Sequence, residues 1–263
     1  MLVKFSINEI QYNTPKGWSE VLFSKFLEYL DDIQPQRPIC LDEFLSDHYK
    51  FISEIDKNLE DKERERIAVK MFQQRWNKMK HLEKEICHNF FAVDVGFWCD
   101  INPQLIKEAM NLEDLKNTFW TLQLEMNPSN SDIDETFVGF EINGVEYLLP
   151  KKHMTESTVL EFSESAQFQS QMKNVEGGDF RAMADVMVVL CKPKGEVYSY
   201  NEMKHNRRKK LFLSTTMDNV INTAFFLLKL NETLKSNLLI YTLEKEKQAM
   251  TLESFNLVMG GHL

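Results

Sequence analysis

Residues 140–150 read FEINGVEYLLP and residues 4–15 read KFSINEIQYNTP, so one short phrase occurs in both halves of the chain. In the later copy, apolar and polar residues alternate on both sides of the Asn-Gly pair at 143–144. An Asn-Gly pair between alternating runs is the strongest short-range signal for a β-hairpin, because both turn residues tolerate positive φ. The earlier copy has Asn-Glu at 8–9, which suits such a turn less well. We predict a hairpin in each copy.

A helix is predicted after each hairpin. Ser19 is placed to cap the first helix and Ser157 to cap the second, and apolar residues follow each of them at steps of three and four. The apolar positions are Val21, Leu22, Phe26, Leu27 and Leu30 in the first helix, and Val159, Leu160, Phe162, Ala166 and Phe168 in the second. Because an isolated hairpin is only marginally stable in water, we expect each hairpin to pack on helices.

Two further pairs of segments repeat in the same order along the chain. AVDVGFWC at 92–99 corresponds to ADVMVVLC at 184–191, with Ala first and Cys last in both. LEDLKNTFWTL at 112–122 corresponds to MDNVINTAFFLL at 217–228, and the two share an Asn and an aromatic residue at matching places. Three ordered blocks predict that one hairpin-and-helix unit has been duplicated.

The predicted fold is α+β and predominantly helical, with two tandem related modules, each a short β-hairpin followed by a helix bundle. The first module spans 1–126 and the second 136–250. Between them, residues 127–135 are rich in Asn, Pro, Ser and Asp without apolar periodicity, which is typical of a linker. Residues 41–81 form an insertion in the first module that is rich in Glu, Lys, Arg and Gln and lacks Gly and Pro. This composition predicts a charged pair of helices that stands off the first module.

Composition and charge exclude several classes of protein. The chain has 263 residues, of which 43% are hydrophobic and 27% charged, as in a globular protein with a core. Its net charge of −9 argues against a protein whose main task is to bind the nucleic-acid backbone, since phosphate contacts need a basic face. No apolar run reaches the roughly 18 residues of a membrane span, and the N-terminal residues alternate instead of forming the apolar block of a signal peptide. We therefore expect a soluble chain made in a cytoplasm.

The four cysteines are predicted to be reduced and to pack as small apolar residues. Cys40, Cys87, Cys99 and Cys191 show neither C-x-x-C spacing nor the density of a disulfide scaffold. A zinc site built from His81, Cys87, His88 and Cys99 has no standard ligand spacing. Cys99 also corresponds to Cys191 in a copy that lacks the other three ligands, which favours packing. We predict no metal site.

The segment KHNRRKK at 204–210 is the one dense basic cluster in the sequence. It has two interpretations: a solvated helix face, which the acidic charge of the chain favours, or a nucleic-acid contact. Under the second interpretation the candidate nucleic-acid-binding residues are Lys204, Arg207, Arg208 and Lys209. We predict that they contribute little to such binding.

No catalytic residue or cofactor is predicted. EGGD at 176–179 has two glycines but lacks the G-K-[ST] ending of a phosphate-binding loop. Asp179 is better interpreted as the N-cap of a helix whose apolar positions are Phe180, Met183, Val186, Met187 and Leu190. The many acidic residues leave open an enzyme whose site is assembled from scattered carboxylates, but no Ser, His and Asp set stands out.

The C-terminal segment follows an amphipathic helix predicted at 232–250. The tail, TLESFNLVMGGHL at 251–263, concentrates apolar side chains where the sequence offers no further element to cover them. Chain ends are usually mobile unless they dock, so two outcomes stay open: the tail folds back on the second module, or it inserts into a neighbouring subunit. The candidate partner-binding residues are Phe255, Leu257, Val258 and Met259.

FEINGVEYLLP and its degenerate copy FSINEIQYNTP resemble a phrase, F-x-[FI]-[ND]-G-x-x-[YF]-x-[LV]-P, with which tail assembly chaperones and other small accessory proteins of tailed bacteriophages often open before a helical remainder. The resemblance implies a non-enzymatic bacteriophage assembly or virion structural protein, either chaperone-like or a tail or connector component. Its partners would be other phage structural proteins or copies of itself. Its place would be the host cytoplasm during assembly, or the virion. The insertion at 41–81 departs from such a compact unit, and a nucleic-acid-associated regulator that uses 204–210 is the alternative.

Overall fold

In its described residues the protein is predominantly helical with two small antiparallel sheets, an α+β fold. The computed structural model describes residues 4–55, 60–125, 133–134, 136–150, 160–161, 163–167, 180–227 and 229. The chain divides into two compact units, Met1–Ser131 and Asp132–Leu263, which are described separately below. The predicted helix at 232–250, the tail at 251–263 and most of the predicted linker at 127–135 lie outside the described residues.

Both predicted hairpins are present. In the first unit, β1 (Lys4–Ile7) pairs with β2 (Ile10–Asn13), and in the second, β3 (Gly139–Ile142) pairs with β4 (Val145–Leu148). Each turn consists of two residues with positive φ, namely Asn8 (50°) and Glu9 (67°), and Asn143 (52°) and Gly144 (75°). This is the geometry of a type I′ turn, whose twist matches that of the flanking strands. Glu9 therefore adopts a conformation that residues other than Gly, Asn and Asp rarely take.

The two hairpins also share a cross-strand aromatic pair. Phe5 lies opposite Tyr12 with ring centroids 5.7 Å apart, and Phe140 lies opposite Tyr147 at 6.0 Å; both pairs are stacked. In the second unit a third strand, β5 (Lys192–Pro193), extends the sheet on the β4 side. Aromatic pairs of this kind add to sheet stability and give each hairpin one apolar face.

The helix predicted after the first hairpin is present but is broken into pieces, and its predicted cap is wrong. The segment consists of η1 (Trp18–Glu20), α1 (Phe23–Glu28), the π-helical η2 (Tyr29–Ile33) and η3 (Gln34–Gln36). Ser19 lies inside η1, and Leu22 precedes α1 without a capping side chain. Val21 and Phe23 are both buried two positions apart, a spacing that extended backbone provides and a continuous helix does not. Leu22, predicted as apolar core, is exposed as a result.

The rest of the first unit is a helix bundle. It consists of α2 (Ile39–Glu54), α3 (Asp61–Lys78), α4 (His81–Cys99), α5 (Pro103–Ala109) and α6 (Leu112–Glu125). Helices α4 and α6 pack against each other through Phe91 and Phe119, whose rings stack at 3.9 Å. α5 lies against both α4 and β1, so the bundle also covers the first hairpin.

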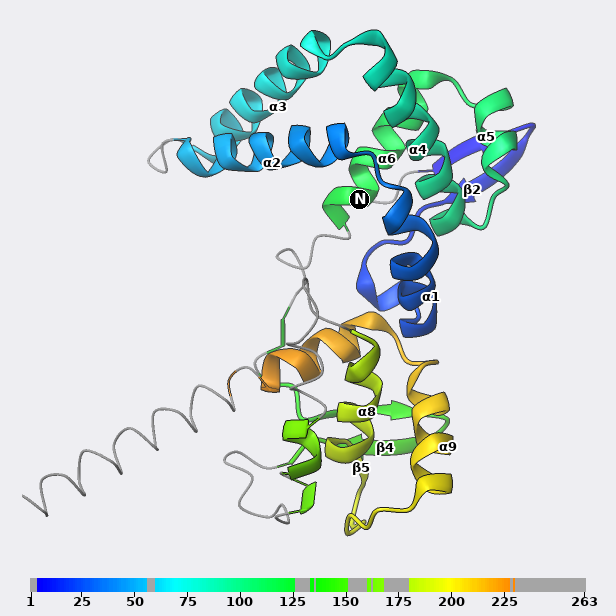
Figure 1. Ribbon diagram of the computed structural model, residues 1–263, viewed down its shortest axis with the longest axis vertical. Coiled ribbons are helices and arrows are strands. Elements are labelled where there is room, and N and C mark those ends of the chain that lie inside the picture. Colours follow the sequence, from blue (N-terminus) through cyan, green and yellow to red (C-terminus); the bar gives the residue numbers. More distant parts are fainter. Residues whose placement is uncertain are drawn as a thin grey trace, which may run out of the picture. The chain divides into compact units, whose positions relative to one another are not determined.

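The predicted helical insertion is present as α2 and α3, but it does not merely stand off the module. One end of the pair joins the core: Trp76 of α3 lies 5.5 Å from Phe44 of α2 and 5.8 Å from Phe91 of α4. Phe72 of α3 meets Trp120 of α6 at 4.5 Å. The other end extends away from α4 and α6 (Figure 1). Among the many charged residues of α2 and α3, the aromatic residues Phe44, Phe72 and Trp76 lie on the side that faces the bundle. Their burial holds the two helices against α4 and α6.

In the second unit, α8 (Arg181–Leu190) is the central element and most of its residues are buried. α9 (Glu202–Phe212) packs against α8 (Figure 1). Phe212 at the end of α9 packs on the hairpin, 5.5 Å from Phe140 and 5.0 Å from Tyr147. Residues 217–227 form a further helix. The predicted apolar positions Met183, Val186, Met187 and Leu190 are buried, whereas Asp179, the predicted N-cap, lies outside the described residues.

The helix predicted after the second hairpin is present at 160–161 and 163–167, but it turns a different face inward. Leu160 and Ala166, predicted as core, are exposed, whereas Glu161 and Ser165 are buried. The predicted cap Ser157 and the predicted core residues Val159, Phe162 and Phe168 lie outside the described residues. Glu161 is buried because it forms an ion pair with Lys192 of β5, a partner that helical periodicity does not reveal.

Candidate functional site

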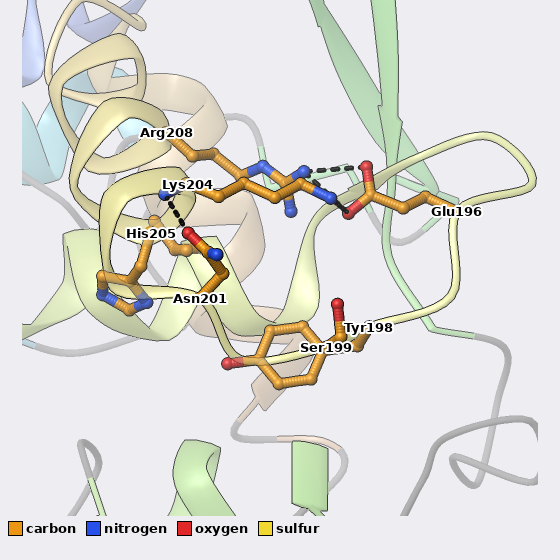
Figure 2. Close-up of a pocket in the computed structure, with 8 residues that line it drawn as sticks. Glu196, Tyr198, Ser199, Asn201, Lys204, His205 and Arg208 are labelled. Atoms are coloured by element: carbon orange, nitrogen blue, oxygen red, sulfur yellow. Dashed lines mark hydrogen bonds and ion pairs between the residues drawn. The ribbon is translucent and has the colours of Figure 1, made fainter.

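Polar side chains gather in the second unit around α9. Asn201 caps this helix, and its side-chain oxygen accepts a hydrogen bond from the backbone N–H of Lys204 at 2.9 Å. The loop before this helix carries Glu196 and Tyr198 back toward the same surface (Figure 2).

Glu196 is the acceptor at the centre of this group. Nη2 of Arg208 lies 2.8 Å from each of its carboxylate oxygens, and Nζ of Lys204 lies 2.8 Å from Oε1 (Figure 2). Burial acts to raise the pKa of Glu196, but the hydrogen bonds from Arg208 and Lys204 and their positive charges outweigh it, so its pKa lies below the usual value. The guanidinium of Arg208 also lies 6.0 Å above the ring of Tyr147, and its side chain is 9% exposed. It therefore connects α9, the loop and the hairpin.

A second acid, Asp185 of α8, holds the other side of the basic cluster. Nε2 of His205 lies 3.0 Å from Oδ1, and Nζ of Lys209 lies 2.8 Å from Oδ2. Asp185 is flanked by apolar residues in α8, and this was a signal in the sequence that a polar partner faces it. We refer to Asp185, Glu196, Lys204, Arg208 and Lys209 as the α9 charge network.

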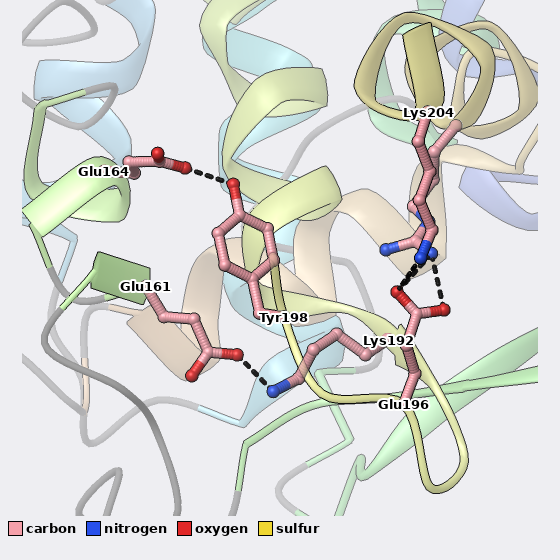
Figure 3. Close-up of polar contacts among 7 residues, drawn as sticks. Glu161, Glu164, Lys192, Glu196, Tyr198 and Lys204 are labelled. Atoms are coloured by element: carbon pink, nitrogen blue, oxygen red, sulfur yellow. Dashed lines mark hydrogen bonds and ion pairs between the residues drawn. The ribbon is translucent and has the colours of Figure 1, made fainter. Parts of the chain in front are cut away.

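Two further contacts join the loop and β5 to the helix at 160–167. Tyr198 donates to Glu164, and Lys192 pairs with Glu161 (Figure 3). Burial, together with the hydrogen bond to Glu164 and its negative charge, raises the pKa of Tyr198. Tyr198 therefore stays protonated and acts as a hydrogen-bond donor that ties the loop down.

The hollow between these elements is small. Its volume is about 10 Å³, which is room for roughly one water molecule. Its lining residues are Val188, Glu196, Tyr198, Ser199, Asn201, Lys204, His205 and Arg208 (Figure 2). Of these residues, Glu196 binds Lys204 and Arg208, and a hollow of this volume is too small for a substrate.

The structure places three of the four candidate nucleic-acid-binding residues in internal ion pairs. Lys204 and Arg208 bind Glu196, and Lys209 binds Asp185, while Arg207 is exposed. Paired charges contribute little to a basic field at the surface. The candidate partner-binding residues of the tail, Phe255, Leu257, Val258 and Met259, lie outside the described residues.

The ligands considered for a zinc site do not come together. Within the part of the chain that the structure describes, no three His, Cys, Asp or Glu side chains converge as metal ligands. Burial raises the pKa of the Cys99 and Cys191 thiols to about 12, and both are free cysteines, Cys191 buried and Cys99 half-buried. Cys40 and Cys87 are free thiols with sulfur atoms 3.8 Å apart.

The first unit contains a buried acid that the sequence did not single out. Asp94 of α4 is fully buried, and donor groups of Tyr29, Gln123 and Trp98 face its carboxylate. Burial raises its pKa to about 6, although the hydrogen bond from Tyr29 and the positive charge of Arg37 oppose the shift. Tyr29 begins the π-helical segment η2, a distortion that is frequent near functional sites.

Asp94 should make the first unit less stable at neutral than at mildly acidic pH. A carboxyl with a raised folded pKa stabilises the fold fully below its unfolded pKa, near 4, and that contribution is lost as the pH rises through about 6. From pH 5 to pH 7 we expect a loss of roughly 1 kcal/mol due to this residue. Urea unfolding of wild type and Asp94→Asn at both pH values measures it. The change in the free energy of unfolding between pH 5 and pH 7 should differ between wild type and Asp94→Asn by roughly 1 kcal/mol.

Asp47→Asn is the matched control, because Asp47 is exposed on α2. It should leave the pH dependence of stability unchanged. An Asp94→Asn variant with the same pH dependence as wild type would show that Asp94 titrates in the folded state as it does in the unfolded chain.

Comparisons with known proteins give no relative. No family model, curated protein or solved structure matches the chain. Among the described residues, no helix combines the length and apolar character needed to cross a membrane.

Proposed function

We propose that the chain is a non-enzymatic protein of bacteriophage assembly or of the virion, which acts through protein–protein contacts as a tail assembly chaperone or a tail or connector component. The observation that supports this most is the pair of matching hairpins. They have the same register, the same two-residue turn and the same stacked Phe–Tyr pair. Ile10 and Val145 follow the turn at equivalent positions, and both are exposed. An exposed apolar residue beside the turn of each hairpin gives the chain two equivalent places at which protein partners could bind.

We further propose that the two units are related by duplication of one hairpin-and-helix module. The blocks that repeat in the sequence occupy comparable elements. Cys99 ends α4 and Cys191 immediately follows α8. Leu115 and Thr118 in α6, like Val220 and Thr223 in the helix at 217–227, are buried. A duplicated module would present two similar binding surfaces on one chain, although a fold by itself does not fix a function.

The nucleic-acid alternative has less support. Three of its four candidate residues, Lys204, Arg208 and Lys209, would first have to leave Glu196 and Asp185, and breaking the buried pair between Arg208 and Glu196 is costly. We therefore retain the assembly function.

The test follows an epitope-tagged chain through phage infection. Fractions of infected cells and purified virions should show it either bound to tail or connector intermediates or retained in virions. A phage without the gene should accumulate incomplete particles, and the wild-type gene supplied in trans should restore them. Normal particle yield without the gene, together with a protein that sediments alone throughout infection, would refute the proposal.

A further inference from the structure

The two hairpins differ at one edge. β4 pairs on both sides, with β3 and with β5, whereas β2 pairs with β1 and has no second neighbour among the described residues. Gln11 and Asn13 of β2 are exposed. An unpaired strand edge presents free N–H and C=O groups and is a template for another strand. The edge of β2 is thus exposed in the first unit, whereas the equivalent edge of β4 in the second unit is paired with β5.

The register identifies the backbone groups at this edge. In a two-residue hairpin, the residues that flank the turn exchange hydrogen bonds, and every second pair does the same. Ile10 and Tyr12 therefore direct their N–H and C=O groups toward β1, and Gln11 and Asn13 direct theirs outward. The second hairpin agrees with this alternation. Leu148, the counterpart of Asn13, pairs with Lys192 of β5. Pro193, which has no N–H, lies opposite Tyr147, whose backbone N–H and C=O point toward β3 instead of β5.

The first unit does not supply a covering strand of its own at the corresponding place. After α8 the chain passes directly into β5. After α4, Asp100 adopts a left-handed conformation (φ 56°), and the N–H of Ile101 binds the carbonyl of Gly96 at 2.8 Å. Pro103 then begins α5, which lies against β1. The turn at the end of α4 thus replaces the third strand.

The β2 edge also lacks the features that usually protect an edge strand. The segment IQYN carries no charge and no proline. Its counterpart β4 has Glu146 where β2 has Gln11, and Glu146 lies 3.8 Å from Lys194 beyond β5. A neutral edge lets two identical strands approach without like charges facing each other. That favours a second copy of this chain as the occupant.

We propose that β2 is a self-association edge, on which β2 of a second copy pairs in antiparallel orientation. Gln11 of each copy would lie opposite Asn13 of the other, with the two Tyr12 residues facing each other at the twofold axis. The result is a four-stranded sheet with each β2 flanked on both sides, as β4 is in the second unit. An isologous pairing of this kind is closed and stops at two copies. This pairing names one protein partner for the proposed function, namely a second copy of the chain. It rests on the proposed function only in assuming that the chain acts through contacts with proteins.

Sedimentation equilibrium of the full chain between about 1 and 200 µM tests the pairing, since a contact through one four-residue strand is expected to be weak. Wild type should pass from monomer to dimer. Gln11→Lys places a charge at the edge, and Asn13→Pro removes an outward N–H without touching the bonds to β1. Each should weaken dimerisation at least tenfold. Glu146→Lys, the matched change on the covered strand β4, should leave it unchanged.

Amide exchange measured by NMR gives a second readout that unfolding cannot imitate. The amides of Gln11 and Asn13 should become protected as the concentration rises, while those of Ile10 and Tyr12 are protected at every concentration. A wild type that stays monomeric to 200 µM would overturn the proposal, and so would a dimer that neither variant weakens. Neither result would touch the assembly function, which the infection experiment tests independently.

Discussion

Replacing Trp76 with alanine should lower the free energy of unfolding of the first unit by about 4 kcal/mol. Trp76 is 7% exposed. Its ring meets Phe44, Phe72, Phe91 and Trp120 from α2, α3, α4 and α6 at centroid distances of 5.5, 6.3, 5.8 and 6.2 Å. Truncation removes a large apolar surface and leaves a cavity where four helices meet, and both effects oppose folding. Urea unfolding followed by far-ultraviolet circular dichroism measures the loss.

Val69→Ala is the matched control, because Val69 lies on the same helix and is 51% exposed. It should change the free energy of unfolding by less than about 0.5 kcal/mol. Since the chain has two units, the transition of the first must be separated from that of the second before the values are compared. A loss below about 1 kcal/mol for Trp76→Ala would mean that α3 stands off the bundle as its composition suggested.

Replacing Arg208 with alanine should lower the free energy of unfolding of the second unit by about 3 kcal/mol at pH 7. The change leaves Glu196 partly buried with Lys204 as its one remaining cation in the α9 charge network. It also removes the guanidinium that lies over the Tyr147 ring. Removal of one partner from a buried pair is costly because the other charge stays out of water.

The effect of Arg208→Ala should depend on pH in a defined direction. Because the pKa of Glu196 is lowered in the folded state, the stabilisation is present above its unfolded pKa, about 4.5, and is lost as the pH falls through the folded value. Wild type and variant should therefore converge in stability at low pH. Thermal unfolding across pH 3 to 7 provides the comparison.

Arg207→Ala is the control, since it removes the same type of side chain one position away on the exposed face of α9. It should alter stability by less than about 0.5 kcal/mol. Equal losses from Arg207→Ala and Arg208→Ala would show that the ion pair with Glu196 adds nothing to the fold. A pH-independent loss would instead assign the role of Arg208 to packing against Tyr147.

The hairpins were predictable because the signals that form them are local. Alternation sets the two faces, and two turn residues that accept positive φ set the register, as at Asn143 and Gly144. Even Glu9, which suits the turn poorly, adopts positive φ once the flanking strands pair. The helices α2, α3, α8 and α9 were predictable for a similar reason, since apolar spacing and capping act over a few residues.

The candidate site was only half predictable. The basic cluster was visible as a run of Lys and Arg, but Glu196 and Asp185, which neutralise it, lie in other elements. Asp94 is one acid among 40 Asp and Glu residues in the sequence, and only its burial distinguishes it. Nothing along the chain indicates that Glu161, rather than Leu160, faces inward.

The sequence by itself determined the elements of this protein: two hairpins, their turns, most of the helices and an excess of acidic charge. The tertiary structure alone decided which faces those elements bury and which charges meet. It placed Trp76 in the core of a charged helical pair, Arg208 against Glu196, and β5 on β4, whereas β2 has no second strand beside it among the described residues. The physical reason is that the two kinds of interaction act over different separations along the chain. Turn conformation and helical periodicity act between residues a few positions apart, whereas burial and ion pairing depend on residues that only folding brings together.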